Sequence, residues 1–255
     1  MSGAAKGKLY LVPAPLDFGC DELAPLQDVM PLGTVHIAAR LSRWICENAK
    51  STRAYLKRID ALQPLTVPLQ SQQIQELPRE VHKKGDHTGS FDARPLLLAA
   101  TEGHDVGLVS EAGMPAIADP GSSVVRAAHD LGLEVVPLTG PMSLMLALAA
   151  SGLNGQNFAF GGYLPQTPAE RVQRIRELES LALKSGQTQI FIETPYRNAA
   201  LFQSLLQTLQ GNTRLSLSCG LTMHKCWSRS AQVSTWKRDK TQAPLDLPTV
   251  FCMGR

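Results

Sequence analysis

The chain has 255 residues, of which 18% are charged, and its formal net charge is +3. This length allows one or two domains with a sizeable apolar core. The charge is far from the strongly basic balance that would require a nucleic acid as partner, and no apolar run reaches the ~20 residues that a membrane-spanning helix needs.

The five cysteines are scattered along the chain without the spacing of a zinc site. An odd number of cysteines, together with the absence of a signal peptide pattern, favours reduced thiols in the cytoplasm. We therefore expect a cytoplasmic protein that uses no metal.

The first part of the chain alternates short apolar runs with helical patterns. Residues 8–12 and 43–46 are predicted strands, and residues 29–40 between them have helical periodicity. Residues 63–75 are polar and rich in proline, which is typical of a connection. Residues 81–88 combine two histidines, two lysines and a glycine, as an acceptor-facing loop or an ordinary basic loop would.

A carboxylate, Glu47, directly follows the second predicted strand. At the carboxyl end of a strand it could orient an acceptor hydroxyl or take its proton. The alternatives are a helix N-cap or a surface carboxylate. The helix that follows carries Arg53, Lys57 and Arg58, which could face a phosphate backbone or form a solvated face.

After a helix predicted at residues 91–101, two loops contain glycine and proline. One follows a strand at residues 106–109 and runs to Gly121, and the other contains Gly140 after a strand at residues 133–138. Ligands bind at the carboxyl edge of open α/β sheets, and glycine lets a ligand approach the main chain. We expect the two loops to lie side by side in a ligand site.

The rest of the chain continues the alternation of helices and strands. Predicted helices cover residues 122–131, 143–150, 169–184 and 198–209, and predicted strands cover residues 157–161, 189–192, 214–219 and 247–253. This pattern predicts an α/β fold.

Six blocks, taken in order, carry a resemblance that covers nearly the whole chain. They are residues 9–13, 109–121, 135–141, 158–165, 190–197 and 221–222. They resemble the tetrapyrrole (corrin/porphyrin) methylase superfamily, most closely the ribosomal small-subunit methyltransferase I family, which methylates a cytidine ribose of 16S rRNA. The chain is similar to a short branch that lacks the C-terminal extension usual in that family.

The resemblance implies two α/β domains, residues 1–119 and 120–255, with a donor site in the cleft between them. It also implies S-adenosylmethionine as methyl donor, a homodimer, and the ribosomal small subunit as acceptor. The donor contacts carried over by matched block are Pro13, Gly113, Met114, Ile117, Met142, Ser143, Glu193, Thr194, Leu221, Thr222, Pro248 and Thr249. Many of them would act through the main chain.

A ribose hydroxyl is a poor nucleophile, so a general base would help its methylation. Glu47, His87 and Glu111 are the candidate catalytic residues. The family has Glu-Asp-Thr-Arg where this chain has Glu47 followed by Asn-Ala-Lys, and it has Asp where this chain has Glu111.

Two other functions stay open at this point. One is a methylase of a tetrapyrrole or another small metabolite, which the superfamily supports. The other is a donor-binding protein without catalysis, which the altered block at residues 47–50 suggests. The sequence does not identify the acceptor atom.

Overall fold

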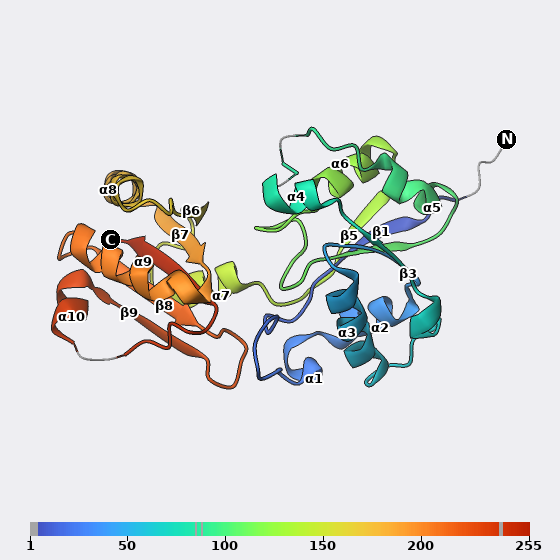
Figure 1. Ribbon diagram of the computed structural model, residues 1–255, viewed down its shortest axis with the longest axis horizontal. Coiled ribbons are helices and arrows are strands. Elements are labelled where there is room, and N and C mark those ends of the chain that lie inside the picture. The colour runs from blue at the N-terminus through green and yellow to red at the C-terminus, as the bar shows by residue number, and fades with distance from the viewer. Residues whose placement is uncertain (1–4, 85, 88, 240–241) are drawn as a thin grey trace. The chain divides into compact units, whose positions relative to one another are not determined.

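A computed structural model describes residues 5–84, 86–87, 89–239 and 242–255, which form two compact α/β units (Figure 1). The first unit runs to Pro141, except that Cys20–Glu22 group with the second unit, Met142–Arg255. The predicted division after residue 119 lies too early. Strand β5 (Glu134–Pro137) pairs with β1 (Lys8–Val12). This pairing keeps β5, and the helix at Ser122–Asp130 that precedes it, in the first unit.

The first unit contains one parallel sheet with the strand order β3-β2-β4-β1-β5. The remaining strands are β2 (Arg43–Cys46), β3 (Gln73–Glu76) and β4 (Val106–Val109). All four residues of β4 are buried, as in a parallel sheet that is covered on both faces.

Helices cover both faces of this sheet (Figure 1). Trp44 packs on one side among apolar residues of α2 and α3, whereas Ile45 packs on the other side among those of α6 and the segment before β4. Successive strand residues point to opposite faces, so a continuous apolar strand serves both layers. The helices are α1 (Leu26–Val29), α2 (Leu32–Arg40), α3 (Ala49–Asp60), η1 (Leu69–Ser71), α4 (Arg79–Lys84), η2 (Arg94–Leu97), α5 (Leu98–Thr101) and α6 (Ser122–Asp130).

The strand order reverses between β2 and β4. The chain passes from β1 through β2 to β3 toward one edge of the sheet, and then through β4 to β5 toward the other. In open α/β sheets, ligands bind at the carboxyl ends of the strands where such a reversal occurs. Glu47 and Ser110 directly follow β2 and β4, so both lie at this position.

The second unit contains a mixed sheet with the order β6-β7-β10-β8-β9, in which only β6 and β7 are parallel. Phe191 and Phe251 stack on the face covered by α8, α9 and α10, whereas Ile190 and Val250 pack against α7. The elements are α7 (Ser143–Ser151), β6 (Phe158–Tyr163), α8 (Pro168–Ser185), β7 (Thr188–Glu193), α9 (Pro195–Thr208), β8 (Arg214–Cys219), β9 (Trp227–Gln232), α10 (Val233–Arg238) and β10 (Thr249–Gly254).

The structure differs from the predicted elements mainly at polar segments. The predicted connection at residues 63–75 runs into β3, an edge strand whose side chains are mostly exposed. Part of the predicted basic loop is helix α4, and β9 with α10 was not predicted. Among the described residues, no helix is both long and apolar enough to cross a membrane.

Candidate active site

The loops after β1, β4 and β5 meet at the carboxyl edge of the first sheet. Ala14 and Gly113 exchange two backbone hydrogen bonds of 2.9 Å. A Cβ atom added to Gly140 would lie 2.2 Å from Cγ of Pro13, and one added to Gly113 would lie 3.7 Å from the carbonyl oxygen of Pro141. The prediction that the two glycine loops lie side by side is confirmed.

The loop between β4 and α6 is held in an unusual backbone conformation. Gly113, Ala116 and Ala118 have φ angles of +69°, +64° and +66°. Left-handed alanines are costly and occur mostly where the surrounding structure or function requires them. Met114 and Ile117, two of the predicted donor contacts, lie in this loop, and the side chain of Ile117 is exposed.

In the second unit, the predicted donor residues gather at one end of the sheet. Glu193 at the end of β7 pairs with Thr249 at the start of β10, and the Gly220 amide donates to the carbonyl of Pro248. Thr222 has a φ angle of +68°. Its buried Oγ1 has no hydrogen-bond partner in the described part of the chain.

The other predicted donor residues of this unit lie at helix starts or against the same cluster. Met142 is the N-cap of α7 and precedes Ser143, and Thr194 is the N-cap of α9. Met142 and Leu221 pack against one apolar cluster.

The carboxylate of Glu193 has a structural role. It accepts hydrogen bonds from Nε and Nη2 of Arg197 at 2.9 and 2.7 Å and from the Thr194 amide at 2.8 Å. These contacts stabilise the first turn of α9, where a negative charge is favoured. A donor contact at this position would therefore come from the main chain.

Three carboxylates lie close together beyond β2 and β4. Burial, followed by the charges of Glu47 and Glu111, raises the pKa of Asp119 to about 7. Oε1 of Glu111 also accepts a hydrogen bond from Oγ of Ser51 at 3.3 Å. The structure thus brings together two of the predicted catalytic residues and adds Asp119, the second acidic residue of the β4–α6 loop, which the sequence reasoning did not single out.

The helix-cap interpretation of Glu47 is wrong. The N-cap of α3 is Asn48, whose side chain accepts from the amides of Lys50 and Ser51 at 2.8 and 3.3 Å. Glu47 is half-buried rather than on the surface. The catalytic role of Glu47 therefore stays a prediction, and the helix-cap role is no longer an alternative to it.

His87, the remaining candidate base, is exposed. Its neighbour Asp86 is buried and accepts hydrogen bonds from the amides of Gly121 and Ser123, each at 2.9 Å. Although burial would raise the pKa of Asp86, these bonds and those of the serine hydroxyls lower it. The side chains at positions 82–84 lie outside the described residues, so the acceptor role of this loop stays a prediction.

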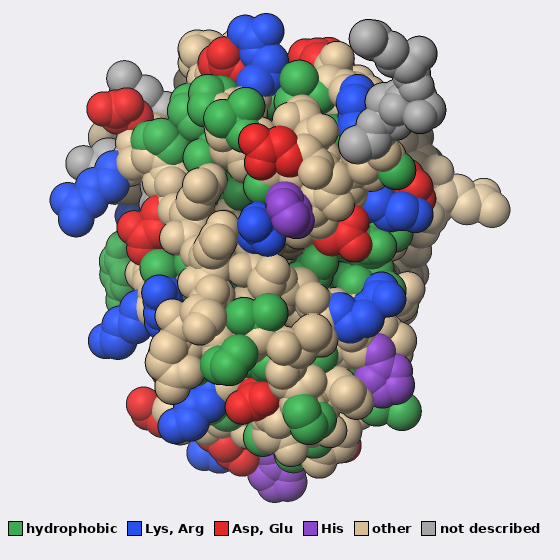
Figure 2. Space-filling model, turned by 90° about the vertical axis from the view of Figure 1, so that its right-hand side faces the viewer, with side chains coloured by type: hydrophobic (Ala, Val, Ile, Leu, Met, Phe, Trp, Pro, Cys, Tyr) green, Lys and Arg blue, Asp and Glu red, His purple; other side chains and the backbone are tan. Residues whose placement is uncertain are grey.

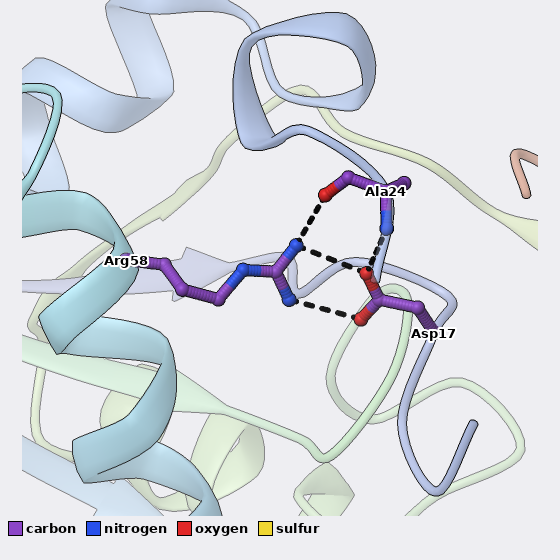
Figure 3. Close-up of polar contacts among 3 residues, drawn as sticks. All are labelled: Asp17, Ala24 and Arg58. Carbon is purple, nitrogen blue, oxygen red and sulfur yellow. Dashed lines mark hydrogen bonds and ion pairs between the residues drawn. The ribbon is translucent and has the colours of Figure 1, made fainter. Parts of the chain in front are cut away.

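The predicted set of three cations on α3 is incomplete, because Arg58 has a different role. Figure 3 shows its guanidinium pairing with both carboxylate oxygens of Asp17, at 3.0 and 2.9 Å, and donating to the carbonyl of Ala24 at 2.7 Å. The amide of Ala24 in turn donates to Asp17 at 2.9 Å. These bonds close the loop of residues 17–24, while Arg53 and Lys57 are exposed.

A pocket of about 170 Å³ lies within the first unit, between this loop, α3 and the end of β4. Phe18 and Leu23 line it with exposed apolar side chains, and Ser51, Ser110 and Glu111 supply polar groups. Glu111 therefore belongs to both the pocket and the carboxylate cluster. No group of three or more His, Cys, Asp or Glu among the described residues is arranged to hold a metal ion; the predicted independence from metals stays a prediction.

We expect Asp119→Asn to raise the melting temperature at pH 8 and to leave it nearly unchanged at pH 4. The pKa of Asp119 is raised from 3.8 to about 7, so between these values the folded protein retains a proton that the unfolded chain releases. Stability therefore falls as the pH rises through this window. Because Asp119 is partly solvated, we expect a gain of about 1–2 kcal/mol at pH 8, or about 2–6 °C.

Asp92→Asn is the matched control. The side-chain hydrogen bond from Arg94 lowers the pKa of Asp92 to about 2, so its charge is favoured in the folded state. This variant should not gain stability at pH 8. Melting curves from pH 4 to pH 8 test both variants, and a shift of Asp119→Asn that does not depend on pH would contradict the raised pKa of Asp119.

Comparison with known proteins agrees with this architecture. The model of the tetrapyrrole (corrin/porphyrin) methylase family matches residues 34–225. The chain belongs to this family. A solved tetrapyrrole methylase fold, the uroporphyrin-III-C-methyltransferase of Thermus thermophilus, aligns with a TM-score of 0.51 at 18% identity. The alignment covers 98% of this chain and 94% of that one, and it supports the fold alone.

Curated relatives in the same family carry a more specific name, ribosomal RNA small subunit methyltransferase I. The chain is 36% identical to that of Vibrio cholerae over 54% of this chain and 46% of the relative. It is 31% identical to that of Mesorhizobium japonicum over 84% and 63%, and 30% identical to that of Xylella fastidiosa over 83% and 67%. This tetrapyrrole methylase chain thus spans about half to two thirds of the length of these relatives.

Proposed function

We propose that this chain is an S-adenosylmethionine-dependent methyltransferase that acts on a ribose 2'-hydroxyl, the acceptor being a cytidine of small-subunit ribosomal RNA. The observation that carries the proposal is the carboxylate cluster of Glu47, Glu111 and Asp119. It lies at the switch point of the first sheet, where the strand order reverses between β2 and β4, and burial with the neighbouring charges raises the pKa of Asp119 to about 7. The names of the relatives support ribosomal RNA as the acceptor.

The residues of the predicted donor contacts fit a polar ligand that binds through the main chain. In the first unit Pro13, in the loop after β1, approaches Gly140 so closely that a side chain is excluded at Gly140. In the second unit Thr222 offers a buried hydroxyl without a partner among the described residues. The residues named in each unit are proposed donor contacts, and the donor, when bound, would supply an activated methyl group on its sulfonium.

The carboxylates are proposed to accept the proton of the ribose hydroxyl. A base works best when its pKa lies near the operating pH, because it is then both unprotonated and able to hold a proton. Burial and the charges of Glu47 and Glu111 favour the protonated form of Asp119 and so raise its pKa into this range. The rate should therefore rise with pH and level off above about pH 7.

RNA binding would rely on distributed rather than concentrated positive charge. On the face drawn in Figure 2, basic and acidic side chains are interspersed, in agreement with the net charge of +3. Arg53 and Lys57 are exposed cations of α3, the helix that lines the pocket. They are proposed to contact phosphates near the pocket; the predicted contribution of Lys83 and Lys84 concerns side chains outside the described residues.

The double variant Arg53→Glu, Lys57→Glu should lower RNA affinity about tenfold and reduce its salt dependence. Each phosphate contact releases a counterion, so its loss flattens the plot of log affinity against log salt. Filter binding of a small-subunit rRNA fragment from 50 to 300 mM salt measures both quantities. Lys184→Glu on α8 is the control and should change neither.

The decisive experiment is methyl transfer from labelled donor to small-subunit rRNA that lacks the modification, with mapping of ribose and base methylation. Label at a cytidine 2'-oxygen would support the proposal. Label on a tetrapyrrole but not on RNA would replace it, and donor binding without any transfer would leave a binding protein. The homodimer and the cytoplasmic location stay predictions.

A further inference from the structure

The pocket of the first unit has a size that limits what it can hold. Its volume is about 170 Å³. A cavity of about 150 Å³ in another protein accommodates benzene, so this pocket admits about one six-membered ring. A tetrapyrrole macrocycle carries four pyrrole rings and would not enter it.

The mouth of the pocket is apolar, whereas its inner end carries a polar group. Phe18 and Leu23 are 48% and 56% exposed, so apolar surface is available where a ligand would enter. At the inner end Ser110 is 6% exposed, and its Oγ has no hydrogen-bond partner in the described part of the chain. A buried hydroxyl without a partner is costly, and a ligand that bonds to it would remove this cost.

The mouth of the pocket is organised before any ligand binds. The loop that carries Phe18 and Leu23 is closed by the contacts among Asp17, Ala24 and Arg58 (Figure 3). The side chain of Asp17 is 4% exposed, so this pair is shielded from water. A fixed aromatic side chain binds a flat ring at a lower entropic cost than a mobile one.

We infer that this pocket binds the target nucleoside of the RNA, with the base against Phe18 and a polar group of the nucleoside bonded to the hydroxyl of Ser110. The inference rests on the proposed function. Proteins recognise single-stranded RNA by stacking splayed bases on aromatic side chains and by hydrogen bonds to their edges. Since Glu111 lines the pocket and is itself one of the three carboxylates, a nucleoside bound here would have its ribose near them.

Kinetics with the RNA acceptor test the inference. Phe18→Ala should raise KM for RNA about tenfold, since stacking on one aromatic side chain contributes on this scale, whereas Phe18→Trp should retain most of the affinity. Ser110→Ala should also raise KM. The hydroxyl of Ser110 has no hydrogen-bond partner among the described residues, so this variant should fold normally. The control is Tyr196→Ala in the second unit, an exposed aromatic residue outside the pocket.

A binding measurement separates this inference from the proposed function. Free cytidine, added to the full chain, should shift the amide resonances of residues 17–19 and 109–111, and Phe18→Ala should abolish these shifts. If the wild type methylates RNA but Phe18→Ala has an unchanged KM, or if cytidine leaves these resonances unchanged, the inference is wrong and the proposed function stands. If no RNA is methylated although cytidine binds in the pocket, the proposed function is wrong instead.

Discussion

Glu47→Gln should lower turnover on RNA about 100-fold while leaving donor affinity and the melting temperature close to those of the wild type. The factor is the lower end of what a positioned general base contributes. Glu47 lies directly after β2 at the switch point, is half-buried, and interacts with Asp119. Glutamine keeps the size of the side chain, so the change removes charge and basicity without opening a cavity.

The pH profile of this variant carries additional information. The charge of Glu47 is one of the causes that raise the pKa of Asp119. Without it, the limb on which the rate rises with pH should move to lower pH. A shifted limb with nearly normal maximal turnover would mean that Glu47 only tunes Asp119, and the proton acceptor would then be Asp119 itself.

Asn48→Ala is the matched control for Glu47→Gln. Asn48 caps α3, so its loss should destabilise the protein by about 1 kcal/mol and leave turnover nearly normal. Melting temperature and turnover measured on both variants separate the two roles. Normal turnover of Glu47→Gln across the pH range would contradict its catalytic assignment.

Gly113→Val should reduce donor affinity at least 100-fold, from an expected Kd in the micromolar range. Gly113 has a φ angle of +69°, which a β-branched residue adopts only at high cost. Its backbone bonds to Ala14 tie the β4 loop to the β1 loop, so a change of conformation here displaces both loops. Titration calorimetry with S-adenosylmethionine measures the affinity.

Gly186→Val is the control for backbone strain. Gly186 has a φ angle of +67° at the end of α8, and a Cβ atom there meets nothing within 4 Å. This variant should lose stability for the same conformational reason but bind the donor normally. Intact donor binding by Gly113→Val would remove the glycine loops from the donor site.

The sequence by itself was sufficient for the elements with a strong apolar period. Strands such as Lys8–Val12 and Val106–Val109 and the helix Pro168–Ser185 appear where the pattern predicts them, because burial of an apolar face depends mainly on local spacing. The six blocks also indicated the family that the comparison confirms. Elements with polar sequences, such as Trp227–Gln232, were missed, because their pairing partners alone make them strands.

Contacts between distant parts of the chain decided the rest. No local pattern shows that Glu134–Pro137 pairs beside Lys8–Val12 and so moves the division between the units to Pro141. Likewise, the sequence pattern groups Arg58 with two surface cations. In the fold, Arg58 instead pairs with Asp17, which is 41 residues away in the chain. The group of three carboxylates is the clearest case. Asp119 is an ordinary loop carboxylate in the sequence, and its raised pKa arises only because folding buries it near Glu47 and Glu111.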